Sequence, residues 1–127
     1  MAYAGITKGT SALHAAMLIT AERLGVAEEL YGELEAGQSA LFARMESMIP
    51  ALPAVSGRYI GEMREIASTL AGCDMPAGFH EGAAELYELL EQSPFASERR
   101  DTVDKSRGLR RTIEVCARSP KDTVDAD

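Results

Sequence analysis

The stretch from Ala2 to Leu24 constrains the fold of this chain more than any other segment. One set of its apolar residues recurs at spacings of three, four and seven, the period of one face of an α-helix. They are Ile6, Leu13, Met17, Ala21 and Leu24. Such a helix is about 35 Å long, which is the width of a small domain. We therefore expect the other elements to pack around it, against this apolar face.

A second stripe on the same helix consists only of small residues. It is formed by Ala2, Gly5, Gly9, Ala12 and Ala16. A glycine costs a helix about 1 kcal/mol relative to alanine, whereas small residues allow another backbone to come close. We therefore expect a neighbouring element to press against Gly5 and Gly9.

Further helical patterns follow at 26–35, 38–49, 57–71 and 79–92, separated by glycine and proline. Gly25 is predicted to end the first helix, and Ser56 is predicted to cap the helix at 57–71. No strand-like alternation occurs in the sequence. The prediction is an all-α bundle of about five to six helices around the long N-terminal one.

The sequence divides into a helical domain at 1–92 and a polar tail at 93–127. Within the tail, 109–117 fits a short helix, and the charged end, 121–127, is predicted to be disordered. The segment 98–111 carries six Lys/Arg against three Asp/Glu. We interpret it as a solvated mixed-charge surface, with a phosphate-contacting tail as the alternative.

Composition excludes several classes of function. The net charge of −7 argues against binding nucleic acid, because that affinity comes mainly from cationic side chains. Charged residues interrupt the longest apolar run, so no membrane span is predicted. Cys73 and Cys116 have no metal-binding or redox spacing, which predicts no metal site and fits the reducing cytoplasm. A small secreted protein, with its N-terminus cleaved as a signal peptide, is an alternative.

No residues form a complete active site, so no catalytic residue is assigned. His14 is interpreted as a packed or rim residue of the first helix, and His80 as a cap at a helix start, with a functional role as the alternative. Glu62 and Glu65 are three residues apart, so a helix places them on nearby faces. This polar edge is either solvated surface or one side of a cleft. The candidate substrate-binding residues for such a cleft are Tyr3, Thr7, Lys8, Glu62, Arg64 and Glu65.

Three sequence blocks carry a family resemblance. They are YAGITKG at 3–9, YIGEMREIA at 59–67 and FHEGAAELYELL at 79–90. In content, order and spacing they resemble the C-terminal helical domain of the 6-phosphogluconate dehydrogenase/β-hydroxyacid dehydrogenase superfamily. The similarity is greatest to putative NAD(P)-dependent oxidoreductases with a phosphogluconate dehydrogenase-like C-terminus. The resemblance covers residues 1 to about 92.

The resemblance implies a fold and a role. In such enzymes a Rossmann domain binds NAD or NADP, and a long helix leads into an all-helical domain that contributes substrate contacts and dimer surface. The family's general acid/base lysine stands immediately before the position of Met1, so it falls outside this sequence. Ala4 stands where many relatives carry a substrate-binding asparagine. Arg64 and Glu65 fall where the hydroxyacid branch carries a Lys-Asp pair.

Two hypotheses follow for the function. In the first, the chain forms the substrate cleft and dimer surface of an NAD(P)-dependent hydroxyacid or sugar-acid dehydrogenase. It binds no cofactor itself, because no GxGxxG motif occurs in the sequence, and it is inactive without a Rossmann-domain polypeptide. In the second, it is a stand-alone helical interaction module that only dimerises. Both predict a homodimer formed through helices.

Overall fold

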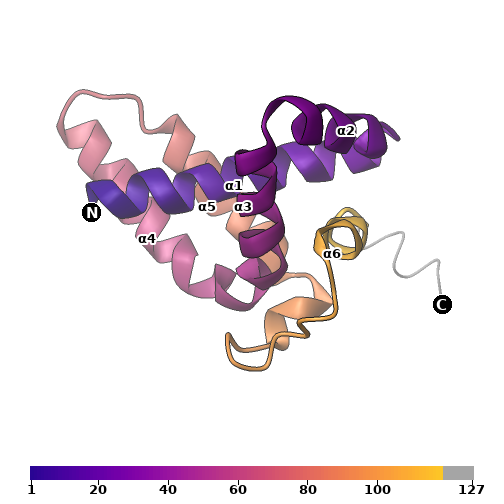
Figure 1. Ribbon diagram of the computed structural model, residues 1–127. Coiled ribbons are helices and arrows are strands. Elements are labelled where there is room, and N and C mark those ends of the chain that lie inside the picture. Colours follow the sequence, from indigo (N-terminus) through magenta and orange to yellow (C-terminus); the bar gives the residue numbers. More distant parts are fainter. Residues whose placement is uncertain (119–127) are drawn as a thin grey trace.

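The computed structural model describes residues 1–118, and within them the chain is all-helical. Six α-helices and two short 3₁₀ segments follow one another along the chain (Figure 1). They are α1 (Ala2–Arg23), α2 (Ala27–Gly37), α3 (Ser39–Met48), η1 (Ile49–Ala51), α4 (Leu52–Gly72), α5 (Gly78–Glu91), η2 (Pro94–Ser97) and α6 (Leu109–Cys116). The predicted all-α fold class is confirmed.

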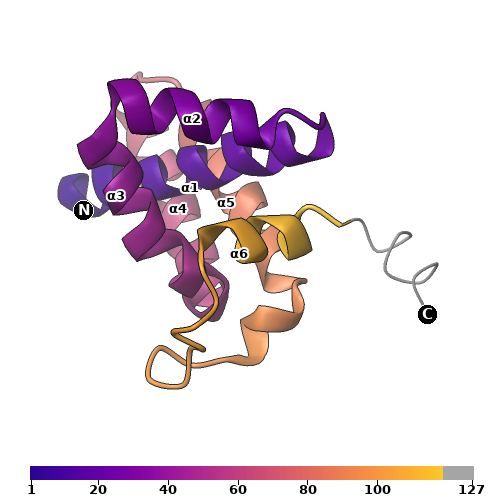
Figure 2. The same ribbon diagram turned by 45° about the vertical axis from the view of Figure 1, so that its right-hand side comes forward.

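Helix α1 crosses the molecule from the N-terminal end, and every other α-helix contacts it (Figure 1). Helices α4 and α5 form an antiparallel pair behind it, while α2 folds back along its second half (Figure 2). Gly25 makes this reversal possible because it adopts the left-handed conformation, with φ at 76°. The Val26 N–H then donates to the Ala21 carbonyl, which completes a Schellman motif. The prediction for Gly25 is confirmed.

The face of α1 that meets the core differs from the predicted face. Ile6, Leu13, Met17 and Leu24 are 54–71% exposed, and of the predicted stripe only Ala21 is buried. The buried face is formed instead by Ser11, Ala12, Ala15, Leu18 and Ile19. Ala12 and Ala15 on this face let neighbouring helices approach α1 closely, while Leu18 and Ile19 fill the core, so the predicted stripe is left outside.

Helix α4 begins earlier than the sequence pattern predicts. Its first residue is Leu52, with Pro53 in the first turn, where a missing N–H costs nothing. Ser56 therefore lies inside the helix, fully buried, and its hydroxyl donates to the Pro53 carbonyl at 2.7 Å. The prediction that Ser56 caps this helix is wrong.

The segment after residue 92 packs against the helices before it. Helix α6 is one residue shorter than the predicted 109–117, and Leu109, Ile113 and Cys116 on it are buried against the core. The predicted disorder at 121–127 lies outside the described residues. Within the described range, tail residues therefore contribute to the same hydrophobic core as residues 1–92.

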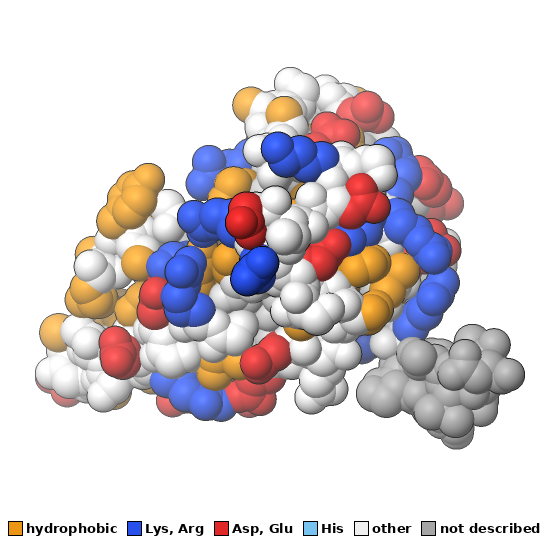
Figure 3. All heavy atoms as spheres, turned by 90° about the horizontal axis from the view of Figure 1, so that it is seen from below, with side chains coloured by type: hydrophobic (Ala, Val, Ile, Leu, Met, Phe, Trp, Pro, Cys, Tyr) orange, Lys and Arg blue, Asp and Glu red, His pale blue; other side chains and the backbone are white. Residues whose placement is uncertain are grey.

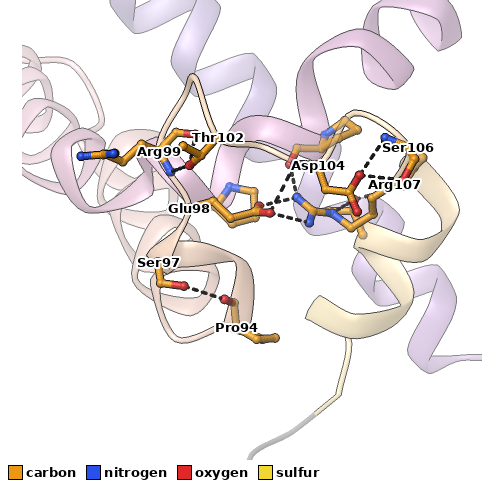
Figure 4. A network of polar contacts seen from close by, with 12 residues as sticks. Pro94, Ser97, Glu98, Arg99, Thr102, Asp104, Ser106 and Arg107 are labelled. Carbon is orange, nitrogen blue, oxygen red and sulfur yellow. Dashed lines mark hydrogen bonds and ion pairs between the residues drawn. The ribbon is translucent and has the colours of Figure 1, made fainter.

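Arg107 anchors the loop that leads into α6 (Figure 4). Its guanidinium makes a bidentate pair with Glu98, at 2.7 and 3.0 Å, and donates to the Pro50 carbonyl at 3.0 Å. It also lies 3.6 Å from the centre of the Phe95 ring, and its side chain is only 6% exposed. The Arg107 hydrogen bonds hold the pKa of Glu98 below its usual range. Arg107 in the basic segment 98–111 therefore holds the fold together. The interpretation of this segment as solvated surface did not predict that role.

Candidate functional site

The glycines of α1 are in close contact with α5. The His80 Nε2 lies 2.9 Å from the Gly5 carbonyl oxygen and therefore donates its proton to it. A Cβ built on Gly9 would lie 3.0 Å from the same nitrogen. The expectation that something presses against Gly5 and Gly9 is confirmed. The prediction that His80 caps a helix is wrong, because its ring bridges α5 to α1 and α5 has no side-chain cap.

This close approach predicts opposite outcomes for two glycine-to-alanine substitutions. Gly9→Ala gains helix propensity but places a methyl against a histidine that is held by its own hydrogen bond, so we expect a net loss of about 1 kcal/mol. Gly61→Ala in α4 meets nothing within 4 Å, so we expect a gain approaching about 1 kcal/mol. Urea unfolding of both variants measures the difference. An equal gain in both would contradict the close packing at Gly9.

A polar cluster lies next to this contact, where α1, α4 and α5 meet. We call it the Lys8 cluster; it comprises Lys8, Tyr59, Glu62 and Tyr87. The Lys8 ammonium forms an ion pair with Glu62 and lies 4.4 Å from the centre of the Tyr59 ring. The Tyr87 hydroxyl donates to the Lys8 carbonyl at 2.5 Å, and its ring meets Tyr59 edge-on at 5.4 Å. Three helices thereby fix the position of one half-buried cation.

The surroundings of Tyr87 determine its protonation state within the cluster. Burial, with Tyr59 and Glu62 as further causes, raises the pKa of Tyr87 well above its ordinary value of 10.0. Tyr87 therefore stays neutral at physiological pH and serves as a hydrogen-bond donor. Lys8 and Glu62 remain 26% and 36% exposed at their side chains. The ammonium has donor capacity beyond Glu62, because a lysine carries three N–H donors.

The structure brings together only part of the predicted substrate-binding set. Lys8 and Glu62 form a pair, as described above. Arg64 pairs instead with Glu88 of α5 in an exposed ion pair, and Glu65 is exposed. The Thr7 hydroxyl donates to the Tyr3 carbonyl of its own helix at 3.1 Å, while the Tyr3 ring is 80% exposed. The candidates thus lie along the edges of α1 and α4 rather than converging on one point.

Sequence reasoning missed Tyr59 and Tyr87 as members of the site. Tyr59 and Tyr87 fall within the predicted helices at 57–71 and 79–92, and both rings are buried. Their roles depend on contacts with α1 across more than 50 residues of sequence, for which spacing gives no signal. The one available signal was the three-residue step from Tyr59 to Glu62, which places both on one face of α4.

An apolar groove lies on the other side of His80, between α1 and α5. It has a volume of about 450 Å³ and is bordered by Thr10 and Leu13 from α1 and by Phe79 and Leu86 from α5. Its floor is formed by Gly9, Ala12, Ala16, Gly82 and Ala83. The Phe79 side chain at its edge is 82% exposed. The groove offers shape and apolar surface rather than charge.

Two classes of site are not found in the part of the chain that the structure describes. Among residues 1–118, no group of three or more His, Cys, Asp or Glu side chains is placed to hold a metal ion. None of the helices described is long and apolar enough to cross a membrane.

Comparison with known proteins gives one match. A family model described as a domain of unknown function (DUF1932) matches residues 21–90, more than half of the 127 residues. The matched region runs from the end of α1 to the end of α5 and includes Tyr59, Glu62 and Tyr87, whereas Lys8 precedes it. No curated protein and no solved structure matches the chain.

Proposed function

The chain belongs to the DUF1932 family, and we propose that it is the helical domain of an NAD(P)-dependent hydroxyacid or sugar-acid dehydrogenase. In this role it forms one wall of the substrate cleft and part of a homodimer surface in the cytoplasm. Catalysis then requires a Rossmann domain, on the same or on another polypeptide.

One observation carries this proposal: the three blocks that resemble the dehydrogenase family pack against one another. The Gly5 carbonyl in the first block accepts a hydrogen bond from His80 in the third, and a Cβ built on Gly5 would lie 3.5 Å from Ile66 in the second. Lys8 pairs with Glu62, and Tyr87 reaches the Lys8 carbonyl. Segments scattered along the sequence thus build one surface.

The charges on this surface fit an acidic substrate. The Lys8 ammonium is held by Glu62 and by the Tyr59 ring, so little side-chain entropy remains to be lost when it binds a carboxylate. Arg64 does not add to this contact, because it pairs with Glu88 of α5 instead. We assign Lys8 as the principal carboxylate contact and Glu62 as the residue that positions it.

The residues described do not fit a nicotinamide cofactor. Dinucleotides bind at the glycine-rich turn between a strand and a helix, and residues 1–118 contain neither a strand nor such a turn. The cofactor is therefore assigned to the Rossmann domain, and the present residues are assigned only substrate binding and association.

One observation is also expected under the second hypothesis, a stand-alone interaction module. Large apolar side chains on α1 are exposed, and such surfaces mark sites of association. The dehydrogenase hypothesis requires a substrate cleft, whereas the interaction-module hypothesis does not. A Rossmann-domain reading frame directly upstream of the gene favours the dehydrogenase, whereas an isolated gene favours the module.

Activity assays with a Rossmann-domain partner test the proposal. The chain alone is expected not to change NAD(P)H fluorescence. Mixed with a Rossmann-domain polypeptide from such an upstream reading frame, it is expected to support reduction of NAD(P)⁺ by a hydroxyacid or sugar acid. Lys8→Gln should raise the KM for the acid by about tenfold or more, because it removes a charge-assisted hydrogen bond.

The matched control is Lys105→Gln, which removes the same charge from an exposed loop residue. It should leave KM unchanged. Tight binding of NAD(P)H by the chain alone would overturn the proposal. Equal KM values for the Lys8 variant and the control would overturn the assignment of Lys8.

A further inference from the structure

A crevice between α5 and α6 forms a second cavity, distinct from the Lys8 cluster. Both helices pack against α1, and the space between them has a volume of about 530 Å³. Small-molecule sites typically measure about 300–1,000 Å³. The crevice shares no residue with the Lys8 cluster. We call it the α5–α6 crevice; its lining includes Arg23, Glu85, Glu88, Leu89, Val115 and Arg118.

The wall of this crevice next to α6 is basic. Arg23, the last residue of α1, is held there because its Nε donates to the Ala117 carbonyl at the end of α6, at 2.9 Å. Arg118 follows Ala117 and borders the same crevice. In Figure 3, Lys and Arg side chains follow the right-hand side of the molecule, the side on which α6 lies in Figure 1. Two guanidinium groups on one wall fit a carboxylate, because their paired N–H donors match its two oxygens.

The wall formed by α5 is acidic. Glu85 and Glu88 are three residues apart on this helix, so their side chains are neighbours, and both border the crevice. Glu88 pairs with Arg64 of α4. Among residues 1–118, no ion pair joins the acidic wall to the basic one, and none involves Glu85. The Glu85 carboxylate is therefore available to a cation that enters the crevice.

Part of the lining is apolar and carries no charge. It is formed by Leu89 of α5, Pro94 of η2 and Val115 of α6. Cys116 also lines the crevice and is buried. Burial raises the pKa of its thiol, so Cys116 stays uncharged at physiological pH. The crevice thus combines a basic wall, an acidic wall and an apolar surface.

The opposite charges of the two walls decide between classes of ligand. A ligand that is only an anion would pair with the arginines but would bring a second carboxylate towards Glu85. A ligand that is only a cation would pair with Glu85 but would approach Arg23 and Arg118. A zwitterion satisfies both walls, because each of its charges meets the opposite charge.

We infer that the α5–α6 crevice binds an amino acid with an apolar side chain. The carboxylate of the ligand pairs with Arg23 and Arg118, its ammonium pairs with Glu85, and its side chain contacts the apolar surface. This site goes beyond the proposed function and does not depend on it. It also gives a role to the segment after residue 92, which supplies Arg118 and lies outside the region 21–90 matched by the family model.

Three probes of nearly equal size test the inference by isothermal titration calorimetry on the full chain. L-leucine carries both charges, 4-methylpentanoate lacks the ammonium group, and 3-methylbutylamine lacks the carboxylate. L-leucine should show saturable binding at millimolar concentrations. Each of the other two probes should bind at least about tenfold more weakly, because it loses one set of charge-assisted hydrogen bonds.

Two substitutions at exposed residues assign the charges of the ligand to the two walls. Glu85→Gln should weaken the binding of L-leucine by about tenfold but should not weaken the binding of 4-methylpentanoate, which has no ammonium group. Arg118→Gln should weaken the binding of both carboxylates but not that of 3-methylbutylamine. This crossed pattern is not expected from a general loss of stability.

The matched controls remove the same charges elsewhere on the surface. Glu46→Gln in α3 and Arg99→Gln in the loop before α6 change exposed residues outside the crevice, so both should leave the dissociation constant of L-leucine unchanged. Lys8→Gln should also leave it unchanged, because the Lys8 cluster is a different site.

Each remaining outcome overturns the inference. No binding of L-leucine to the wild-type chain would mean that the crevice holds only solvent. Equal affinities for L-leucine and 4-methylpentanoate would make it a site for anions alone. Binding of L-leucine that is lost in Lys8→Gln but kept in Glu85→Gln would assign the ligand to the Lys8 cluster. None of these results affects the dehydrogenase assays of the proposed function, so the two proposals fail separately.

Discussion

Replacing Arg107 by alanine is expected to lower the free energy of unfolding by about 3–5 kcal/mol, because one member of a largely buried ion pair is removed. The Glu98 carboxylate loses both of its bonds to the guanidinium, and the Pro50 carbonyl loses a donor. The Phe95 ring also loses the cation that lies over it. Arg107 thus joins three segments, so its loss should release the loop that leads into α6.

Urea unfolding followed by circular dichroism measures this effect. Arg99→Ala is the matched control, because Arg99 is 81% exposed at its side chain and its ion pair with Asp101 is long, at 3.9 Å. We expect the control to remain within about 0.5 kcal/mol of the wild type. If the two variants had equal free energies of unfolding, the hydrogen bonds and ion pair of Arg107 would contribute no more to stability than an exposed ion pair does.

The second large effect is expected at Tyr87, which is fully buried where α1, α4 and α5 meet. Tyr87→Ala should cost about 3–5 kcal/mol, the range for removing a buried aromatic side chain. The loss combines a cavity, the edge-on contact with Tyr59 and the hydrogen bond to the Lys8 carbonyl. Because Tyr87 supports the backbone of Lys8, the variant should also weaken substrate binding in the assembled enzyme.

Tyr87→Phe separates the hydroxyl from the ring. It should cost only about 1 kcal/mol, the typical net value of one hydrogen bond. A second readout follows from the raised pKa of Tyr87. Above pH 10 the unfolded chain releases the tyrosine proton while the folded chain retains it, so the free energy of unfolding falls as pH rises. This fall should be smaller in Tyr87→Phe.

The control for the ring is Tyr3→Ala, because Tyr3 is 80% exposed. It should remain within about 0.5 kcal/mol of the wild type in the isolated chain. If Tyr87→Ala proved as mild as Tyr3→Ala, the packing of α5 on α1 described above would be wrong.

Local features of the fold could be predicted from the sequence. Helical periodicity predicted each long helix, and Gly25 was predicted to end α1, because backbone propensity and capping depend on neighbours within one or two turns. The prediction failed at Ser56 for an equally local reason. Pro53 is compatible with the first turn of a helix as well as with a turn, and the sequence pattern does not distinguish these two positions.

The candidate site could be predicted only in part. Lys8 and Glu62 were both proposed from sequence, but their pairing depends on how α1 crosses α4. Arg64 was grouped with them, although it turns to Glu88 of α5. Arg107 was interpreted as one member of a solvated basic segment, whereas only the folded chain brings Pro50 and Phe95 to it. Each of these partners lies beyond the range over which periodicity carries information.

The sequence by itself determined that this protein is helical, where most of its helices begin and end, and that something must press against Gly5 and Gly9. Only the tertiary structure decided which face of α1 is buried. Both stripes of that helix are uncharged and have helical period, so a hydrophobic pattern alone favours the bulkier one. Close packing of several helices around one axis instead selects a third face, on which Ala12 and Ala15 lie beside Leu18 and Ile19. The predicted stripe is thereby left largely exposed.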